Sequence, residues 1–177
     1  MMKTYDSIIN QCRDIFYKKY DDYGSAWRVM RLSSLTDQIM IKIRRIQVLK
    51  NLDEQKIPDS IEIDLMGVIN YSVIALIQMN CNETTPILLT KEEAMRMYDL
   101  AIDQTQNLYI RKNHDYGDSW KLLRQSSIID LILMKVFRLI NIEKNSGRIL
   151  SSDNIDTIYK DIINYSIFYF LLGDNNN

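Results

Sequence analysis

The sequence repeats itself, and this feature limits the fold more than any other. Residues 18–47 align with residues 111–140 at an offset of 93, with 12 identities in 30 pairs. A second anchor, Ile-Asn-Tyr-Ser, occurs at 69–72 and again at 163–166, at an offset of 94. The one-residue change falls in the loop between the anchors, where insertions are tolerated best. We interpret the chain as a tandem duplication, with repeats over residues 1–80 and 91–172 inside a single domain, 1–177.

Each repeat is predicted to form three helices, because its apolar residues recur at helical spacing. With only 5 Gly and 2 Pro in 177 residues, against averages of roughly 7% and 5%, the chain has few tight turns. The predicted helices span about 5–20, 35–51, 59–79, 91–113, 128–145 and 152–172. Three-helix units of this size bury little surface alone. We therefore predict an all-α helical bundle of two tandem three-helix repeats, related by a pseudo-twofold axis.

The helix ends also carry sequence signals. Ser33 or Ser34 is placed to cap the second helix, where a side-chain oxygen can accept a bond from an unpaired backbone N–H. Gly147 follows the fifth helix and is predicted to end it.

The composition of the chain argues against several classes of function. Lys plus Arg number 22 and Asp plus Glu 23, a formal net charge of −1, so a protein that coats nucleic acid is not expected. The N-terminus has no signal pattern, and no uninterrupted apolar run reaches the ~18 residues of a membrane span. One histidine excludes a His-based metal site, and the spacing of Cys12 and Cys81 suits no metal either. We expect a cytoplasmic protein with free thiols and no membrane partner; a homodimer is left open.

Several polar residues are the same in both repeats. Too little divergence since the duplication is one explanation, and a shared function is the other. The pairs are Lys19/Lys112, Asp22/Asp115, Tyr23/Tyr116, Gly24/Gly117, Trp27/Trp120, Arg31/Arg124, Asp37/Asp130, Lys42/Lys135, Arg45/Arg138 and Asn70/Asn164.

The element Lys-x-x-Asp-Tyr-Gly-x-x-Trp occurs at 19–27 and at 112–120. Its glycine permits a positive φ that ends a helix, and the preceding Asp can stabilise the turn. A purely structural interpretation has the Trp plugging the core. The functional interpretation has Lys19 and Lys112 binding a phosphate while the Tyr and Trp side chains line a base pocket, and spacing alone does not choose between them.

The middle helices of the two repeats share one carboxylate and two cations. In the first repeat, Lys42 and Arg45 lie three residues apart on one face. Solvated charges beside an apolar stripe are one interpretation. The other is a magnesium–nucleotide site, in which a carboxylate binds the metal and the cations bind phosphates.

The third helices differ between the repeats. Asp161 lies three residues before Asn164, whereas the equivalent of Asp161 in the first repeat is Gly67, which has no side-chain oxygen. Asp64 is the nearest substitute, three residues earlier on nearly the same helix face. The halves are therefore not chemically equivalent.

Taken in order, these elements resemble a family labelled nucleotide modification associated domain, type one. They are Lys-x-x-Asp-Tyr-Gly-x-x-Trp, Ser-x-x-Asp-x-x-x-x-Lys-x-x-Arg and Asp-x-x-Asn-Tyr. That family in turn looks like a distant branch of the all-α nucleoside triphosphate pyrophosphohydrolases, the MazG-like and dimeric dUTPase-like proteins. The resemblance covers nearly the whole chain, once per half.

The resemblance implies a MazG-like bundle in which acidic residues on two helices hold Mg²⁺. Water would then attack the phosphate chain of a nucleotide, modified or not, and release a monophosphate and pyrophosphate. Carried over by position, the metal ligands would be Asp37, Asp130 and Asp161. Substrate contacts would be Lys19, Lys112, Tyr23, Tyr116, Trp27, Trp120, Lys42, Lys135, Arg45, Arg138, Asn70 and Asn164.

The chain departs from the MazG-like pattern, which carries Glu-x-x-Glu on one helix and Glu-x-x-Asp on the next. Here the first motif reads Ser-x-x-Asp in both repeats, and the second reads Asp161-x-x-Asn164 or Gly67-x-x-Asn70. The alternative function is therefore a non-catalytic helical protein that kept the fold and lost the active-site carboxylates.

Overall fold

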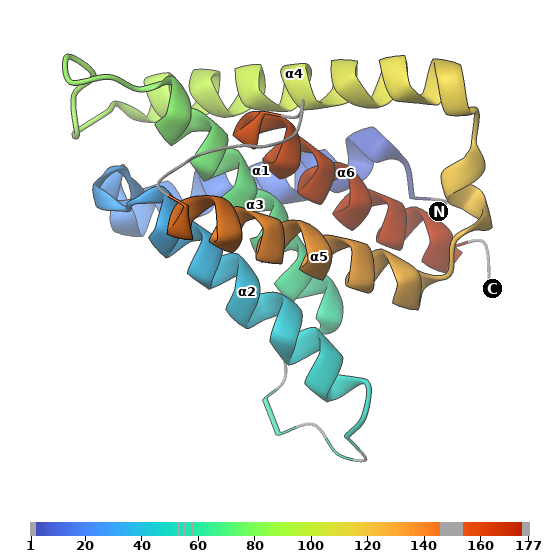
Figure 1. Ribbon diagram of the computed structural model, residues 1–177. Coiled ribbons are helices and arrows are strands. Elements are labelled where there is room, and N and C mark those ends of the chain that lie inside the picture. Colours follow the sequence, from blue (N-terminus) through green and yellow to red (C-terminus); the bar gives the residue numbers. More distant parts are fainter. Residues whose placement is uncertain (1–2, 53, 55, 58, 146–153, 175–177) are drawn as a thin grey trace.

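The computed structural model describes residues 3–52, 54, 56–57, 59–145 and 154–174. All regular secondary structure in these ranges is helical, and the second half repeats the element order of the first (Figure 1). The elements are α1 (Tyr5–Tyr23), η1 (Ala26–Val29), α2 (Leu32–Leu49), α3 (Ile61–Asn80), α4 (Lys91–Tyr116), η2 (Ser119–Leu122), α5 (Gln125–Lys144) and α6 (Ile155–Asp174), where η denotes a short 3₁₀ helix. The predicted all-α fold with two three-helix repeats is confirmed.

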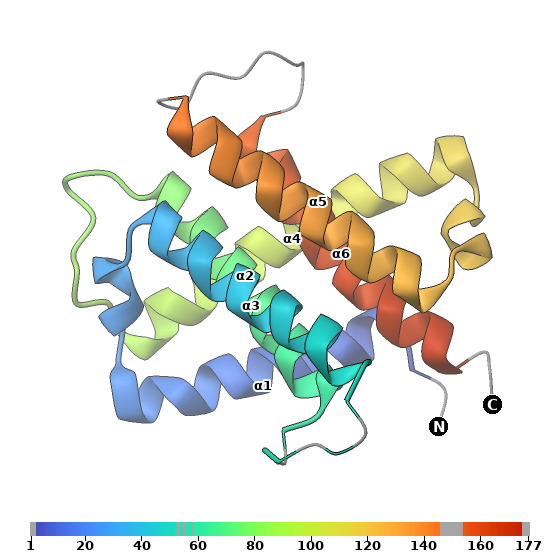
Figure 2. The ribbon, with the colours of Figure 1, turned by 60° about the horizontal axis from the view of Figure 1, so that its bottom comes forward.

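Four helices form the centre of the molecule. Helices α2, α3, α5 and α6 contact one another, and α2 lies beside α5 in Figure 2. Helices α1 and α4 pack outside this group, each against both α3 and α6. Each of these contacts has its counterpart under exchange of the halves, as a pseudo-twofold arrangement requires.

One apolar core runs through both halves. Leu35, Ile39 and Ile43 of α2 and Ile128 and Ile132 of α5 are fully buried in it. Helix α3 is apolar nearly all round because it lies between other helices. Among the described residues it is the one helix long and apolar enough to cross a membrane by length and composition, and most of it is buried inside the protein.

The two halves are joined by a reciprocal pair of hydrogen bonds. Tyr5 Oη donates to Asn164 Oδ1 at 2.8 Å, and its equivalent Tyr98 donates to Asn70 Oδ1, also at 2.8 Å. Each bond joins the first helix of one half to the third helix of the other. Burial raises the pKa of both phenols, so they stay protonated and act as donors.

The observed helix ends correct one prediction and leave another outside the described residues. Helix α2 begins at Leu32 after Arg31, without a side-chain cap, so Ser33 and Ser34 lie inside its first turn. This start is earlier than predicted because η1 leads directly into the helix. The predicted end at Gly147 lies outside the described residues.

The glycines that end α1 and α4 have the predicted left-handed backbone, with φ of 55° at Gly24 and 59° at Gly117. The preceding aspartates do not fix these turns. Asp22 is exposed and has no hydrogen bond within the part of the chain that the structure describes, and Asp115 contacts only the neighbouring His114. The glycine is therefore the residue that permits the turn, since its backbone reaches this region without a Cβ clash.

Candidate functional site

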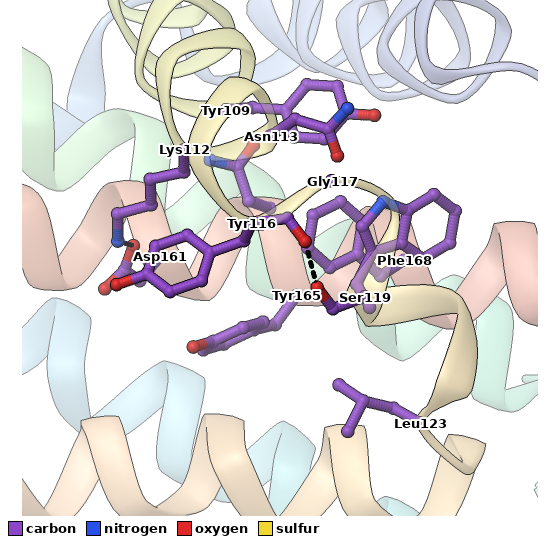
Figure 3. Close-up of a pocket in the computed structure, with 12 residues that line it drawn as sticks. Tyr109, Lys112, Asn113, Tyr116, Gly117, Ser119, Leu123, Asp161, Tyr165 and Phe168 are labelled. Carbon is purple, nitrogen blue, oxygen red and sulfur yellow. Dashed lines mark hydrogen bonds and ion pairs between the residues drawn. The ribbon is translucent and has the colours of Figure 1, made fainter.

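Each half contains a pocket between its first helix, its 3₁₀ helix and its third helix. The first-half pocket, next to η1, has a volume of about 640 Å³, and the second-half pocket, next to η2, has about 380 Å³ (Figure 3). Both volumes suit a small-molecule ligand. Equivalent residues line both pockets: Lys19/Lys112, Tyr23/Tyr116, Gly24/Gly117, Trp27/Trp120, Asn70/Asn164 and Tyr71/Tyr165.

The glycine turn explains how these residues come together. It reverses the chain after the first helix and leads directly into the 3₁₀ helix that carries the tryptophan. The lysine at the end of the helix and the tryptophan after the turn therefore face the same cavity in both halves. The nine-residue motif is thus one wall of each pocket.

Both tryptophans carry an unused hydrogen-bond donor. The indole Nε1 atoms of Trp27 and Trp120 are buried and have no hydrogen-bond partner among the described residues. A buried donor without a partner is unfavourable by roughly 1–3 kcal/mol. Most buried polar groups have a partner, so these two donors need an explanation, and both belong to side chains that line a pocket.

In the second half, the buried carboxylate of Asp161 binds two lysines, Lys112 and Lys135. Asp161 Oδ1 accepts from Lys112 Nζ at 2.6 Å, and Oδ2 accepts from Lys135 Nζ at 2.8 Å. Figure 3 shows the Lys112 side chain reaching down to Asp161 from α4. Asp161 is 5% exposed and lines the pocket. Burial, and after it the charge of Asp161, raises the pKa of the nearby Tyr165.

In the first half, the carboxylate lies one turn earlier on the third helix. Asp64 is buried and accepts from Lys42 Nζ at 3.3 Å and from Arg45 Nη1. It does not line the pocket, whereas Lys19 and Lys42 do. A Cβ atom added at Gly67 would lie 2.5 Å from Lys42 Cε and 3.0 Å from its Nζ. The absence of a side chain at Gly67 is therefore what lets Lys42 reach the cavity.

The predicted magnesium ligands do not come together. Asp37 and Asp130 are exposed on α2 and α5, whereas Asp161 is buried on α6 with both oxygens bound to ammonium groups. Within the described ranges, no three His, Cys, Asp or Glu side chains lie close enough to hold a metal ion. This donor set does not fit a resident Mg²⁺, which needs free carboxylate oxygens.

The asparagines shared by the two repeats have a structural role that sequence reasoning missed. Asn70 Nδ2 donates to the Cys12 carbonyl at 3.0 Å, and Asn164 Nδ2 donates to the Thr105 carbonyl at 3.4 Å. Their side-chain oxygens accept the reciprocal tyrosine bonds described above. Both side chains touch a pocket, but their amides are already used to join α1 and α4 to the central helices.

The predicted cations also separate into two groups. Lys19, Lys42 and Lys112 line one of these two pockets, whereas Arg45, Lys135 and Arg138 line neither of them. Arg45 instead binds Asp64 and the backbone carbonyl of Asp59 at 2.9 Å. The equal spacing in the two repeats did not reveal this division, because it depends on where the carboxylate of the third helix lies.

Gln78, near the end of α3, is a further residue that the sequence did not single out. Its Nε2 donates to the carbonyls of Arg28 and Met30, at 2.9 and 2.8 Å, and thereby holds the end of η1. Its equivalent in the second repeat is Leu172, which cannot donate such bonds. This difference between the repeats was the available sequence signal.

Comparison with known proteins gives one assignment. The family model for nucleotide modification associated domain 1 matches the chain twice, over residues 19–79 and 112–172. Each match covers one pocket motif and the second and third helices of that half. No curated protein and no solved structure matches the chain. The chain belongs to the nucleotide modification associated domain 1 family.

Proposed function

We propose that this protein binds nucleotides in a pocket lined by lysine, tyrosine and tryptophan, and acts as a cytoplasmic nucleotide-binding protein rather than as a magnesium-dependent hydrolase. The observation that carries the proposal is the combination of a lysine and two or more aromatic rings in one cavity lining, where the indole N–H of Trp27 is unpartnered. The name of the family, which refers to nucleotide modification, agrees with this ligand class.

The chemistry of a nucleotide matches these groups. Its phosphate is an anion that ammonium groups bind through charge-assisted hydrogen bonds. Its base has a flat π-face that stacks on Trp or Tyr, with roughly 1–3 kcal/mol per base in single-stranded nucleic acid complexes. The indole N–H supplies a donor for a base or sugar oxygen.

The hydrolase version requires metal ligands, and the donor set argues against it. Asp161 would have to release two lysines before it could bind Mg²⁺, and neither Asp37 nor Asp130 lies with it in a metal-binding group. Any Mg²⁺ in the complex would then be expected to accompany the phosphates of the ligand. The non-catalytic alternative fits this arrangement better.

Calorimetric titration with nucleoside mono- and triphosphates, ribo- and deoxy-, in EDTA and in Mg²⁺, tests the proposal. We expect binding in EDTA, a rise in melting temperature on ligand addition, and no release of pyrophosphate. Lys19→Ala should weaken binding about tenfold, since a charge-assisted bond contributes ~1.5 kcal/mol or more. Lys18→Ala is the matched control, because Lys18 is exposed and does not line the pocket.

Two results would count against this function. Absence of binding by every nucleotide tested would refute it. Pyrophosphate release that depends on Mg²⁺ and is lost in Asp161→Asn would restore the hydrolase interpretation.

A further inference from the structure

We propose that the ligand binds only in the first-half pocket, and that the second-half pocket is closed to it by its own side chains, Asp161 and Phe168. This inference rests on the proposed function and specifies which of the two pockets performs it. Asp161 supplies the negative charge, and Phe168 the stacked ring, that a nucleotide supplies in the first half.

The first argument concerns charge. Two lysines and no carboxylate line the first-half pocket, whereas one lysine and Asp161 line the second. Lys19 has no hydrogen-bond or ion-pair partner in the described part of the chain, and Lys42 shares Asp64 with Arg45. The equivalent lysines, Lys112 and Lys135, both bind Asp161. An incoming phosphate meets the unpaired Lys19, and a Lys42 that shares one carboxylate with Arg45, in the first half. In the second half it meets lysines that are both bound to Asp161.

The second argument concerns aromatic stacking. Trp120 is stacked on Phe168, with ring centroids 4.6 Å apart and an interplanar angle of 9°. The residue equivalent to Phe168 in the first repeat is Ile74, which lines the pocket but has no ring. The ring nearest Trp27 among the described contacts is Phe16, at 6.0 Å and tilted by 49°. Trp27 therefore keeps a face for a base, whereas one face of Trp120 is already covered.

The third argument concerns space and order. The first-half pocket is larger, about 640 Å³ against about 380 Å³. Its wall is also better fixed, because Gln78 and Ser25 hold both ends of η1. Ser25 Oγ donates to the Ile87 carbonyl at 2.7 Å and accepts from the Leu89 N–H at 2.9 Å. A site whose walls are fixed before binding loses less entropy when the ligand arrives.

These features favour a nucleoside phosphate as the ligand, because both its base and its phosphate would then contribute to the binding affinity. Inorganic phosphate alone and the free nucleoside alone should each bind more weakly than the joined molecule. The comparison separates a true nucleotide site from a simple anion site.

The chain offers a direct reporter for each pocket, since it has only two tryptophans, Trp27 and Trp120. In Trp120→Phe, the fluorescence of Trp27 should change on titration with a nucleoside phosphate. In Trp27→Phe, the fluorescence of Trp120 should stay constant. Calorimetry on the native chain should give one ligand per chain. Two ligands per chain, or a saturable change at Trp120, would overturn the inference and leave the proposed function standing.

Substitutions at Gly67, Asp161 and Phe168 test whether these residues decide which pocket binds the ligand. Gly67→Asp should reduce affinity more than tenfold, because the new carboxylate takes up Lys42 and Lys19, whereas the uncharged Gly67→Asn should reduce it less. The double variant Asp161→Gly/Phe168→Ile gives the second half the residues of the first, and Trp120 should then report binding. Circular dichroism establishes that each variant is folded. A folded Gly67→Asp variant with native affinity, or a folded double variant whose Trp120 stays silent, would contradict the inference. If no nucleotide binds the native chain, the proposed function fails with it.

Discussion

The two halves bury one carboxylate each on the third helix, but at different turns, and this changes the character of the two pockets. Asp64 lies one turn before the cavity and binds Lys42 and Arg45 below it. Asp161 lies at the cavity and binds Lys112 across it. The equivalent of Asp64 in the second half is Ile158, and that of Asp161 in the first half is Gly67. Nearly the same set of cations therefore gives an open cationic pocket in one half and a neutral pocket in the other.

The largest expected effect in this comparison is the loss of stability when a buried ion pair is broken. Asp64→Asn should lower the free energy of unfolding by roughly 3 kcal/mol, because it leaves two cations beside a buried site without their counter-charge. Asp161→Asn should cost less, since Lys112 is 45% exposed and can turn to water, which leaves only Lys135, at 13%, without a counter-charge. Denaturation by urea measures both. A loss in Asp161→Asn that equals or exceeds the loss in Asp64→Asn would contradict this ranking.

The reciprocal tyrosine bonds allow the halves to be compared at a matched position. Tyr98→Phe should destabilise the protein by about 1–2 kcal/mol, because the Oδ1 of buried Asn70 loses its donor. Tyr5→Phe should cost less, since Tyr5 is only partly buried and water can replace its hydroxyl. Urea denaturation of both variants provides the test, and equal losses would show that the two ends of the interface are energetically alike.

A smaller effect is expected at the 3₁₀ helices. Gln78→Leu, which places at α3 the residue found at the equivalent position of α6, should remove the bonds that hold η1 and cost about 1 kcal/mol. Hydrogen exchange should accelerate at the Met30 amide, which donates to the Trp27 carbonyl at 3.0 Å. The Leu123 amide holds the equivalent place in η2 and is the internal control. Faster exchange at both amides would mean that Gln78 acts on the whole fold instead.

The smallest expected effect concerns the thiol at the α1–α3 contact. Burial raises the pKa of Cys12 to about 12, so at pH 8 almost no thiolate is present to react. Titration with a disulfide reagent should count at most one thiol per native chain, from the partly exposed Cys81, and two after denaturation. Rapid reaction of both thiols in the native protein would show that α1 separates readily from the central helices.

Sequence reasoning predicted the fold well for two reasons. Helical periodicity is a local signal, and the repeat is found by comparing the chain with itself. It also placed the Lys, Tyr and Trp of the nine-residue motif together, since a single turn joins them. The metal-ligand set stays a prediction. Spacing could not show that Asp37 and Asp130 face outwards while Asp161 is buried, because exposure is not encoded in residue type.

The spacing of residues along the sequence could not predict which side chains pair between different helices. The pairing of Asp64 with Lys42 and Arg45, and of Asp161 with Lys112 and Lys135, depends on how α2, α3, α4, α5 and α6 pack. The asparagines show the same limit. Their identity in both repeats was correctly noticed, but their role in joining α1 and α4 to the core appears only when the helices are assembled.

The exchange of tyrosine and asparagine between the halves bears on the ancestry of the chain. In this fold, the tyrosine of one repeat reaches the asparagine of the other and not its own. An ancestor with one repeat could have formed these bonds only by pairing with an identical copy, as an isologous dimer. In such a dimer every mutation would appear twice, and both pockets would change together. In a single chain that constraint is absent, so one repeat can carry a carboxylate at position 161 while the other has glycine at position 67.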